Sequence, residues 1–232
     1  LKKRTRLQKS FDRTVEGLSS FINEARGYEA LKKLSEDRQC RHFQKKEAVF
    51  NEGDFPRYLY FVNEGKVKIF KTNEEGKDYI IKIHKAGDFF GYIDLVKGTH
   101  YIESAAAMES TELSLIPKDD FLSLLYANRD VSSQMIRMLA DNVAEQEEQL
   151  LQLAYNSIRK RVAEALLKLH NKQPHQSGTS ITILRDDLAG MVGTAKESVI
   201  RTLTDFKNEQ LIDIENGAIF IKNAQKLEQL PN

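Results

Sequence analysis

Four polar side chains between positions 196 and 201 have the chemistry needed to read a DNA duplex. Arg201 can donate two hydrogen bonds to guanine, and Glu197 can accept one from the exocyclic amine of cytosine. Lys196 and Ser198 can bind bases or phosphates, and phosphate contacts would fix the register of the protein without reading sequence. The stretch therefore predicts a helix that enters the major groove.

The residues around these side chains predict a helix-turn-helix unit. Gly193 supplies the tight turn between two helices, and Thr194 is the expected N-cap of the second one. We also count Thr194 among the candidate DNA-binding residues, together with Lys196, Glu197, Ser198 and Arg201. The buried face of the first helix is expected to consist of Leu188, Ala189 and Val192, and that of the second helix of Val199, Ile200, Leu203 and Phe206.

Two of the four polar side chains also have interpretations unrelated to DNA. Thr194 and Glu197 have the spacing of a capping box, in which the glutamate bonds back to the N-cap amide. Arg201 can equally form an ion pair on the surface. We favour the DNA interpretation because the whole unit, and not the motif alone, fits DNA reading.

The residues that follow the second helix predict a β-hairpin. Two apolar runs, 211–214 and 218–222, are joined by Glu215, Asn216 and Gly217, and Asn-Gly between such runs is a strong hairpin signal. A helix-turn-helix followed directly by a hairpin is a winged helix. Two such units on a dimer would bind a pseudo-palindromic site in double-stranded DNA, with half-sites about one helical turn apart.

A long helix predicted at 130–155 has the pattern of a dimerisation helix. Its apolar seam is spaced alternately three and four residues apart, as in a coiled coil, and contains one polar member. The alternative is that this helix packs on its own β-domain. We favour a homodimer, because the stripe keeps the heptad register. The seam consists of Ile136, Leu139, Val143, Gln146, Leu150 and Leu153.

Residues 41–117 predict a β-sandwich or barrel. Short runs rich in Ile, Val, Phe and Tyr are separated by turns that contain glycine, which adopts left-handed backbone freely. A helix is expected to start at Pro117, and another at 156–170 precedes a loop at 171–180. The predicted strands are 48–50, 58–62, 66–71, 78–84, 101–108 and 112–116.

Composition excludes several classes of protein. The chain has 232 residues and one cysteine, Cys40. Because its formal net charge is only +1, any nucleic-acid site must be a local patch of basic residues. One thiol cannot by itself hold a zinc ion or an iron–sulfur cluster. No apolar run approaches the roughly 20 residues of a membrane span, and common catalytic motifs are absent. We therefore expect a cytoplasmic protein that has no membrane contact and is not an enzyme.

The order of these parts resembles the cyclic-AMP receptor/fumarate–nitrate regulator (CRP/FNR) family of transcription regulators. The resemblance covers residues 41–232 and implies an α+β fold: a cyclic-nucleotide-binding-type β-roll (jelly roll), a long dimerisation helix and a C-terminal winged helix-turn-helix. It also implies base contacts for Glu197 and Arg201 and adds RNA polymerase as a candidate partner. The matching motifs are Asn51-Glu52-Gly53-Asp54, Gly65 after Tyr60-Phe61-Val62, Gly87-Asp88-Phe89-Phe90-Gly91, and Lys196 to Arg201.

The candidate effector pocket departs from the family pattern. Members that bind cyclic AMP have a glutamate for the ribose hydroxyl where this chain has Tyr92, and an arginine for the cyclic phosphate where it has Glu103. A carboxylate repels a phosphate, and the lost arginine removes a bidentate partner. We therefore expect no cofactor: no cyclic AMP bound in the family's way and no iron–sulfur cluster. The candidate pocket comprises Gly91, Tyr92, Glu103, Ser104 and Ala105.

The sequence therefore predicts four regions. They are a helical N-terminal extension or linker at 1–38, the β-roll at 39–127, the dimerisation helix at 128–155 and the winged-helix domain at 156–232. The extension looks like the connecting helix of regulators that carry a receiver domain ahead of the roll. The alternative is a helical hairpin that packs on the next domain. A signal from the roll, or from a receiver domain missing from this chain, would control how the recognition helices are placed. A rival function stays open, in which the roll acts through protein contacts and the winged helix does not bind DNA.

Overall fold

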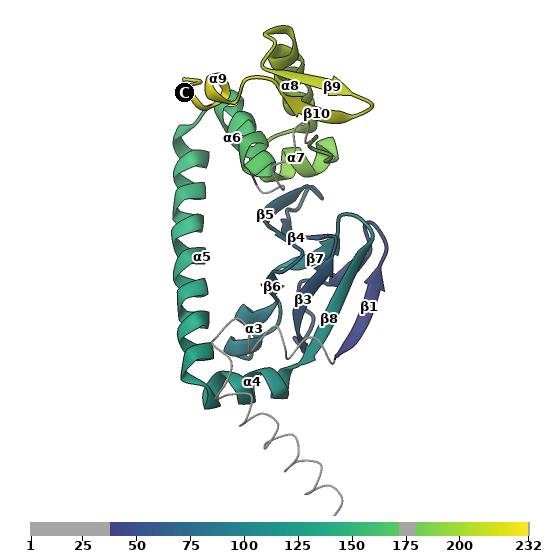
Figure 1. Ribbon diagram of the computed structural model, residues 1–232, viewed down its shortest axis with the longest axis vertical. Coiled ribbons are helices and arrows are strands. Elements are labelled where there is room, and N and C mark those ends of the chain that lie inside the picture. Colours follow the sequence, from purple (N-terminus) through teal and green to yellow (C-terminus); the bar gives the residue numbers. More distant parts are fainter. Residues whose placement is uncertain (1–37, 172–179, 232) are drawn as a thin grey trace, which may run out of the picture. The chain divides into compact units, whose positions relative to one another are not determined.

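The computed structural model describes residues 38–171 and 180–231 (Figure 1). The chain divides into two compact units, one from Leu1–Ile69 and Ile83–Asn142, the other from Phe70–Lys82 and Val143–Asn232. Apart from Arg38, the predicted N-terminal extension lies outside the described residues, as does most of the predicted loop at 171–180.

Two four-stranded sheets form the β-roll that the sequence predicts. The first sheet is antiparallel and has the order β1-β8-β3-β6; the second has the order β2-β7-β4-β5. The strands of the first sheet are β1 (Gln39–Phe43), β8 (Thr111–Pro117), β3 (Tyr58–Glu64) and β6 (Phe89–Phe90). Those of the second are β2 (Ala48–Phe50), β7 (Ser104–Ala107), β4 (Lys66–Thr72) and β5 (Asp78–Lys85).

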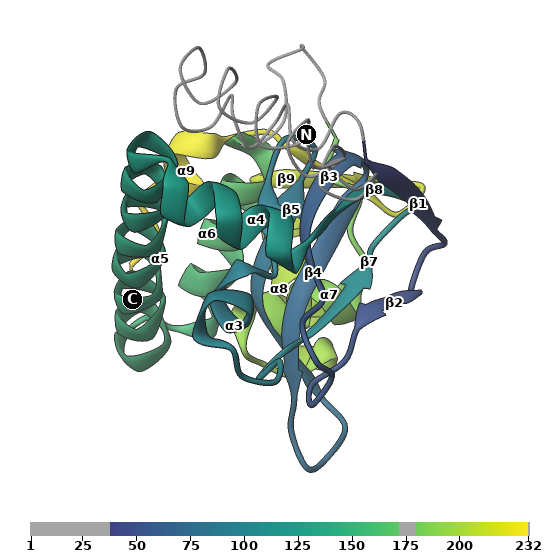
Figure 2. The same cartoon turned by 90° about the horizontal axis from the view of Figure 1, so that it is seen from below.

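Alternation along β3 and β8 divides their side chains between two cores. Tyr60 and Val62 join the interior cluster between the sheets, whereas Leu59 and Phe61 face the other way, because successive side chains of a strand point to opposite faces. Helices α3 (Tyr92–Lys97) and α4 (Lys118–Ala127) cover this second face together with the first turns of α5 (Figure 2).

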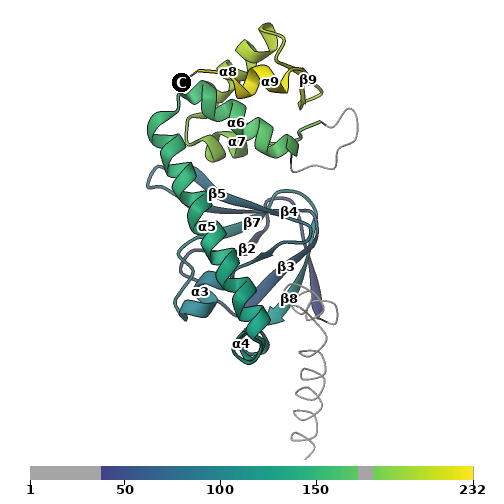
Figure 3. The ribbon, with the colours of Figure 1, turned by 60° about the vertical axis from the view of Figure 1, so that its left-hand side comes forward.

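The long helix α5 (Arg129–Tyr155) runs unbroken for 27 residues (Figure 3). Asn128 ends α4 and caps α5: its Oδ1 accepts hydrogen bonds from the amides of Asp130 at 2.9 Å and Val131 at 3.2 Å. In the described part of the chain, no helix is both long and apolar enough to cross a membrane.

The second unit carries the winged helix. Its elements pack around a core that includes Leu166, Val199 and Phe206, all fully buried. Their bounds are α6 (Ile158–Asn171), α7 (Arg185–Val192), α8 (Lys196–Asn208), β9 (Ile212–Glu215), β10 (Ala218–Ile221) and α9 (Ala224–Glu228).

Within residues 38–171 and 180–231, four elements lack a sequence signal: β1, β6, α3 and α9. Strand β1 is polar and exposed except for Phe43, so it shows no alternation. The other three span two to six residues, too few to establish a period. The predicted strand at 101–108 is shorter than expected and covers Ser104–Ala107.

Candidate nucleic-acid interface

The turn between α7 and α8 is fixed by backbone geometry and by a side chain from α6. Gly193 has φ 67° and ψ 48°, the left-handed region that glycine enters without strain, and its amide bonds to the carbonyl of Ala189. The Nη1 of Arg161 donates to the carbonyl of Val192 at 2.6 Å. A cation at a helix C-terminus is favourable, so Arg161 stabilises the end of α7. Sequence reasoning missed this residue.

Helix α8 begins one residue later than predicted. Its N-cap is Ala195, without a side-chain capping bond, and the amide of Thr194 bonds to the carbonyl of Ala189 as part of the turn. The predicted N-cap role of Thr194 is therefore wrong. The capping box with Glu197 also does not form, because Glu197 is the second residue of the helix and not the third.

Three of the four predicted polar residues lie exposed on α8. Lys196, Glu197 and Arg201 are exposed, and Ser198 is half-buried. The buried side of α8 contains Val199, Leu203 and Phe206 as predicted.

Ile200 contradicts the predicted burial pattern, because its side chain is 46% exposed. It lies one turn after Lys196, on the same face, since residues four apart are neighbours on a helix. Sequence reasoning placed Ile200 in the core because it is apolar, although the spacing from Lys196 indicates the exposed face. An exposed apolar side chain there can contact the methyl group of thymine.

The hairpin of β9 and β10, which forms the wing, is hydrogen-bonded to the start of α7. Asn216 and Gly217 have φ values of 49° and 83°, which match the two left-handed positions of a type I′ hairpin turn. Arg185 donates to the carbonyl of Gly217 at 3.2 Å and to that of Ile183 at 3.3 Å. The position of the wing turn is thereby coupled to α7.

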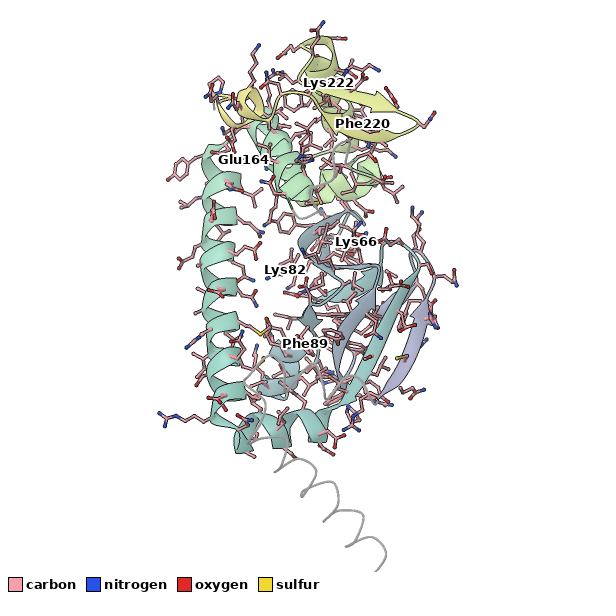
Figure 4. The ribbon with its side chains drawn as sticks, in the orientation of Figure 1. Lys66, Lys82, Phe89, Glu164, Phe220 and Lys222 are labelled. Atoms are coloured by element: carbon pink, nitrogen blue, oxygen red, sulfur yellow. The ribbon has the colours of Figure 1, made fainter. Side chains whose placement is uncertain are left out.

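Two lysines, one on α8 and one after β10, lie close to an aspartate of the wing. Asp213 on β9 lies 3.3 Å from Nζ of Lys207 and 3.2 Å from Nζ of Lys222. Lys222 follows β10, next to Phe220 (Figure 4). Both lysines are about half exposed and can also contact phosphates, although neither was singled out from the sequence.

The five predicted effector residues do not all share one environment. Tyr92 is buried in the core between the sheet and the helices, and its hydroxyl accepts a hydrogen bond from Asn142. Ser104 lies on β7, and its hydroxyl accepts from the amide of Glu52 at 2.9 Å. Ala105 is fully buried between the sheets, and Glu103 is half-buried.

Aromatic rings fill much of the interior of the β-roll near Gly91. The rings of Phe50 and Tyr101 stack at 3.7 Å, and those of Tyr60 and Phe90 at 5.0 Å. Burial raises the pKa of Tyr60 to about 12. A Cβ at position 91 would stand 3.0 Å from the ring of Tyr60, so Gly91 is the residue that lets this ring approach the backbone.

The predicted dimer seam is exposed over most of its length. Ile136, Leu139, Val143 and Leu150 have exposed fractions between 38% and 66%, and Gln146 is also exposed. Leu153 differs: it is half-buried and approaches Gly193 in the turn of the helix-turn-helix.

Two family models match separate parts of this chain. Residues 40–128 match the cyclic nucleotide-binding domain, and residues 160–230 match the Crp-like helix-turn-helix domain. The cyclic AMP receptor protein of Thermus thermophilus is 30% identical over 192 residues, which cover 83% of this chain and 88% of that protein. The chain belongs to the CRP/FNR family of transcription regulators.

Two further proteins resemble this chain at lower sequence identity. The fumarate and nitrate reduction regulatory protein of Escherichia coli is 26% identical over 192 residues, which cover 81% of this chain and 76% of that protein. FixK2 of Bradyrhizobium japonicum has the same fold, with a TM-score of 0.77 at 22% identity, over 84% of this chain and 98% of that one. This CRP/FNR chain is thus a DNA-binding transcription regulator by family.

Proposed function

We propose that this CRP/FNR-family regulator binds pseudo-palindromic duplex DNA as a homodimer and reads it with α8. The exposed polar face of α8, with Lys196, Glu197 and Arg201, is the observation that carries the proposal. Arg201 reads guanine, Glu197 accepts from cytosine, and Lys196 and Ser198 bind bases or phosphates. RNA polymerase is a further candidate partner by family resemblance alone.

The apolar stripe on α5 supports the dimer. Exposed apolar surface costs about 25 cal/mol per Å² relative to burial, and Ile136, Val143 and Leu150 are each more than half exposed. The same stripe on a second copy covers these side chains in heptad register. Pairing would set the spacing of the two α8 helices relative to one DNA turn.

We also propose that cyclic AMP does not control this protein in the way implied by the names of its relatives. The position where cyclic-AMP-binding members have a glutamate holds Tyr92, which is buried and bonded to Asn142. Glu103 adds a carboxylate where those members have an arginine. The controlling signal then arrives through the roll by another ligand or from an N-terminal receiver domain. Calorimetric titration with cyclic AMP tests this: micromolar binding refutes the proposal.

Selection from a random duplex library tests the DNA function. The full chain should enrich a pseudo-palindrome, and Arg201→Ala should weaken binding to that duplex by roughly 5- to 150-fold, equivalent to about 1–3 kcal/mol. Arg129→Ala, at an exposed position near the start of α5, is the matched control and should bind unchanged.

A folded Arg201→Ala protein that binds its site normally refutes the role of Arg201. A protein that is strictly monomeric by light scattering refutes the dimer. If it enriches no duplex over random DNA, the rival function applies: a module acting through protein contacts.

A further inference from the structure

Helix α8 exposes one apolar side chain among the polar residues of its outer face. Within Lys196–Asn208, Ile200 is the one exposed residue whose side chain is wholly hydrocarbon, and it is 46% exposed. The apolar residues that anchor the helix in the winged-helix core, such as Val199 and Leu203, are buried on its other side. Packing of the core therefore does not explain an isoleucine at this position.

Helix stability does not explain it either. A β-branched side chain loses χ1 freedom in a helix, and a surface position is better filled by alanine or by a long polar residue. Single exposed apolar residues are common on protein surfaces, so exposure alone does not identify a function. The inference comes from where Ile200 lies, among the side chains that are proposed to contact DNA.

Ile200 lies in a row with Lys196 and Thr204, because residues four apart are neighbours on a helix. The hydroxyl of Thr204 donates to the carbonyl of Ile200 at 2.9 Å, so its one proton is used within the helix. At the other end of the row, the Nζ of Lys196 lies 2.9 Å from a carboxylate oxygen of Asp186 in α7. The middle of the row thus presents the hydrocarbon side chain of Ile200.

A second row beside the first holds Glu197 and Arg201, the residues proposed to read cytosine and guanine. Ile200 follows Glu197 by three residues, and such neighbours have Cβ atoms about 5–6 Å apart. Successive bases of a strand are separated by about 3.4 Å along the duplex axis. A base contacted by Ile200 therefore lies about one or two steps from a base read by Glu197.

The chemistry of Ile200 favours one base in the major groove. Thymine presents its C5-methyl group there, whereas cytosine presents an amine, and adenine and guanine present further donors or acceptors. A hydrocarbon side chain gains from covering a methyl group. Against the other bases it would remove water from a polar group and offer no hydrogen bond in return, which is unfavourable.

We propose that Ile200 is a specificity-determining residue, which selects a thymine through contact with its C5-methyl group next to the bases read by Glu197 and Arg201. This inference rests on the proposed DNA-binding function and extends it by one residue and one base. The polar row of α8 then selects guanine and cytosine, and the apolar row beside it selects thymine.

Uracil substitution tests the contact with the wild-type protein alone. Uracil pairs with adenine as thymine does and lacks only the C5-methyl group. The probe is the duplex that the full chain enriches from a random library, with each thymine replaced in turn in both half-sites. One replacement should weaken binding by roughly fourfold per half-site, equivalent to about 0.8 kcal/mol for one buried methyl-sized group. The other replacements should have little effect.

Ile200→Ala identifies the side chain that makes the contact. The variant should bind the thymine duplex at least about fourfold more weakly per half-site than wild type does. Uracil at the sensitive position should then have almost no further effect, because the two changes remove the same contact. Alanine is the better helix former, so thermal unfolding of the variant should show an intact winged helix.

Ile102→Ala is the matched control for the truncation. Ile102 lies in the first unit and is 45% exposed, close to the 46% of Ile200, so its loss should leave both the DNA affinity and the effect of uracil unchanged.

Two results overturn the thymine contact. One is equal binding of wild type to the thymine duplex and to every uracil duplex; the other is a folded Ile200→Ala protein that keeps its full sensitivity to uracil. In either case, weaker binding by Arg201→Ala shows that the proposed DNA function still stands. If wild type enriches no duplex, that function fails and the thymine contact fails with it.

Discussion

The Nζ of Lys196, at the start of α8, lies 2.9 Å from Oδ2 of Asp186 in α7. Both side chains are exposed, so the pair adds at most about 1 kcal/mol to stability. Its consequence is electrostatic: Asp186 neutralises a lysine on the face that would meet DNA. A phosphate that binds Lys196 must displace this carboxylate.

Asp186→Asn should therefore tighten DNA binding. The change frees Lys196 for a phosphate, and each additional neutralised phosphate steepens the slope of log K against log salt by about 0.9. We expect tighter binding at low salt and a slope that is more negative by about one unit, measured by fluorescence anisotropy across a salt series. Asp119→Asn, also in the first turn of a helix, controls for the lost helix-terminal charge. An unchanged slope would mean that removing the Asp186 carboxylate adds no phosphate contact.

Arg161→Ala should destabilise the winged helix. Its guanidinium bonds to the Val192 carbonyl at the end of α7, and hydrogen bonds to charged groups contribute roughly 1.5–3 kcal/mol. We expect a lower urea midpoint and weaker DNA binding, because the turn that orients α8 loses its support. Arg129→Ala should leave both quantities unchanged. A normal midpoint for Arg161→Ala would mean that Gly193 alone defines the turn.

Local patterns predicted most of the helices and strands that the structure describes, because the predicted ones have a short-range cause. Alternation in 66–71 predicted β4, and Asn216-Gly217 predicted the wing turn, since both depend on neighbouring residues. The long helix α5 follows in the same way from the helical spacing of its apolar residues. The predicted burial of Ile200 was wrong because it was assigned from the apolar character of the side chain. Adjacent helical residues point about 100° apart, so Ile200 does not share the direction of its buried neighbour Val199.

Contacts between distant segments could not be predicted from the sequence. In the sequence, Gly190 is one residue of a predicted helix with nothing nearby that requires glycine. The need for glycine arises only because the backbone of Asp78, more than a hundred residues away in the chain, packs against it. Arg161 and Val192 are likewise brought together by packing of α6 on α7. No local period encodes such pairs, because they depend on how whole elements pack.

Glu145 should make stability depend on pH in the acid range. Burial raises its pKa, but hydrogen bonds from Lys168 and Lys82 outweigh burial and lower the pKa from 4.5 to about 2. A depressed carboxyl pKa stabilises the fold above the unfolded value, and this contribution is lost as pH falls from about 4.5 towards 2. Solvent screening limits it to about 1 kcal/mol.

Urea unfolding of wild type and Glu145→Gln as a function of pH measures this contribution. The two midpoints should differ near neutral pH and converge as the solution is acidified towards pH 3. Glu147→Gln, an exposed position on the same helix, should show no such convergence. A constant difference between wild type and Glu145→Gln at every pH would mean that the carboxylate acts through packing and not through its charge.

Val143→Glu should break the proposed homodimer, because it places two like charges face to face in the apolar seam predicted on α5. Val143 is 56% exposed, so the substitution disturbs little in the single chain. Burying an unpaired carboxylate in the interface is strongly unfavourable, and we expect the dimer to weaken by about tenfold or more. Ala144→Glu adds the same charge one residue away, outside the predicted seam, and should leave the dimer intact. Sedimentation over a concentration series separates the two variants, and equal weakening by both would mean that α5 does not pair along this stripe.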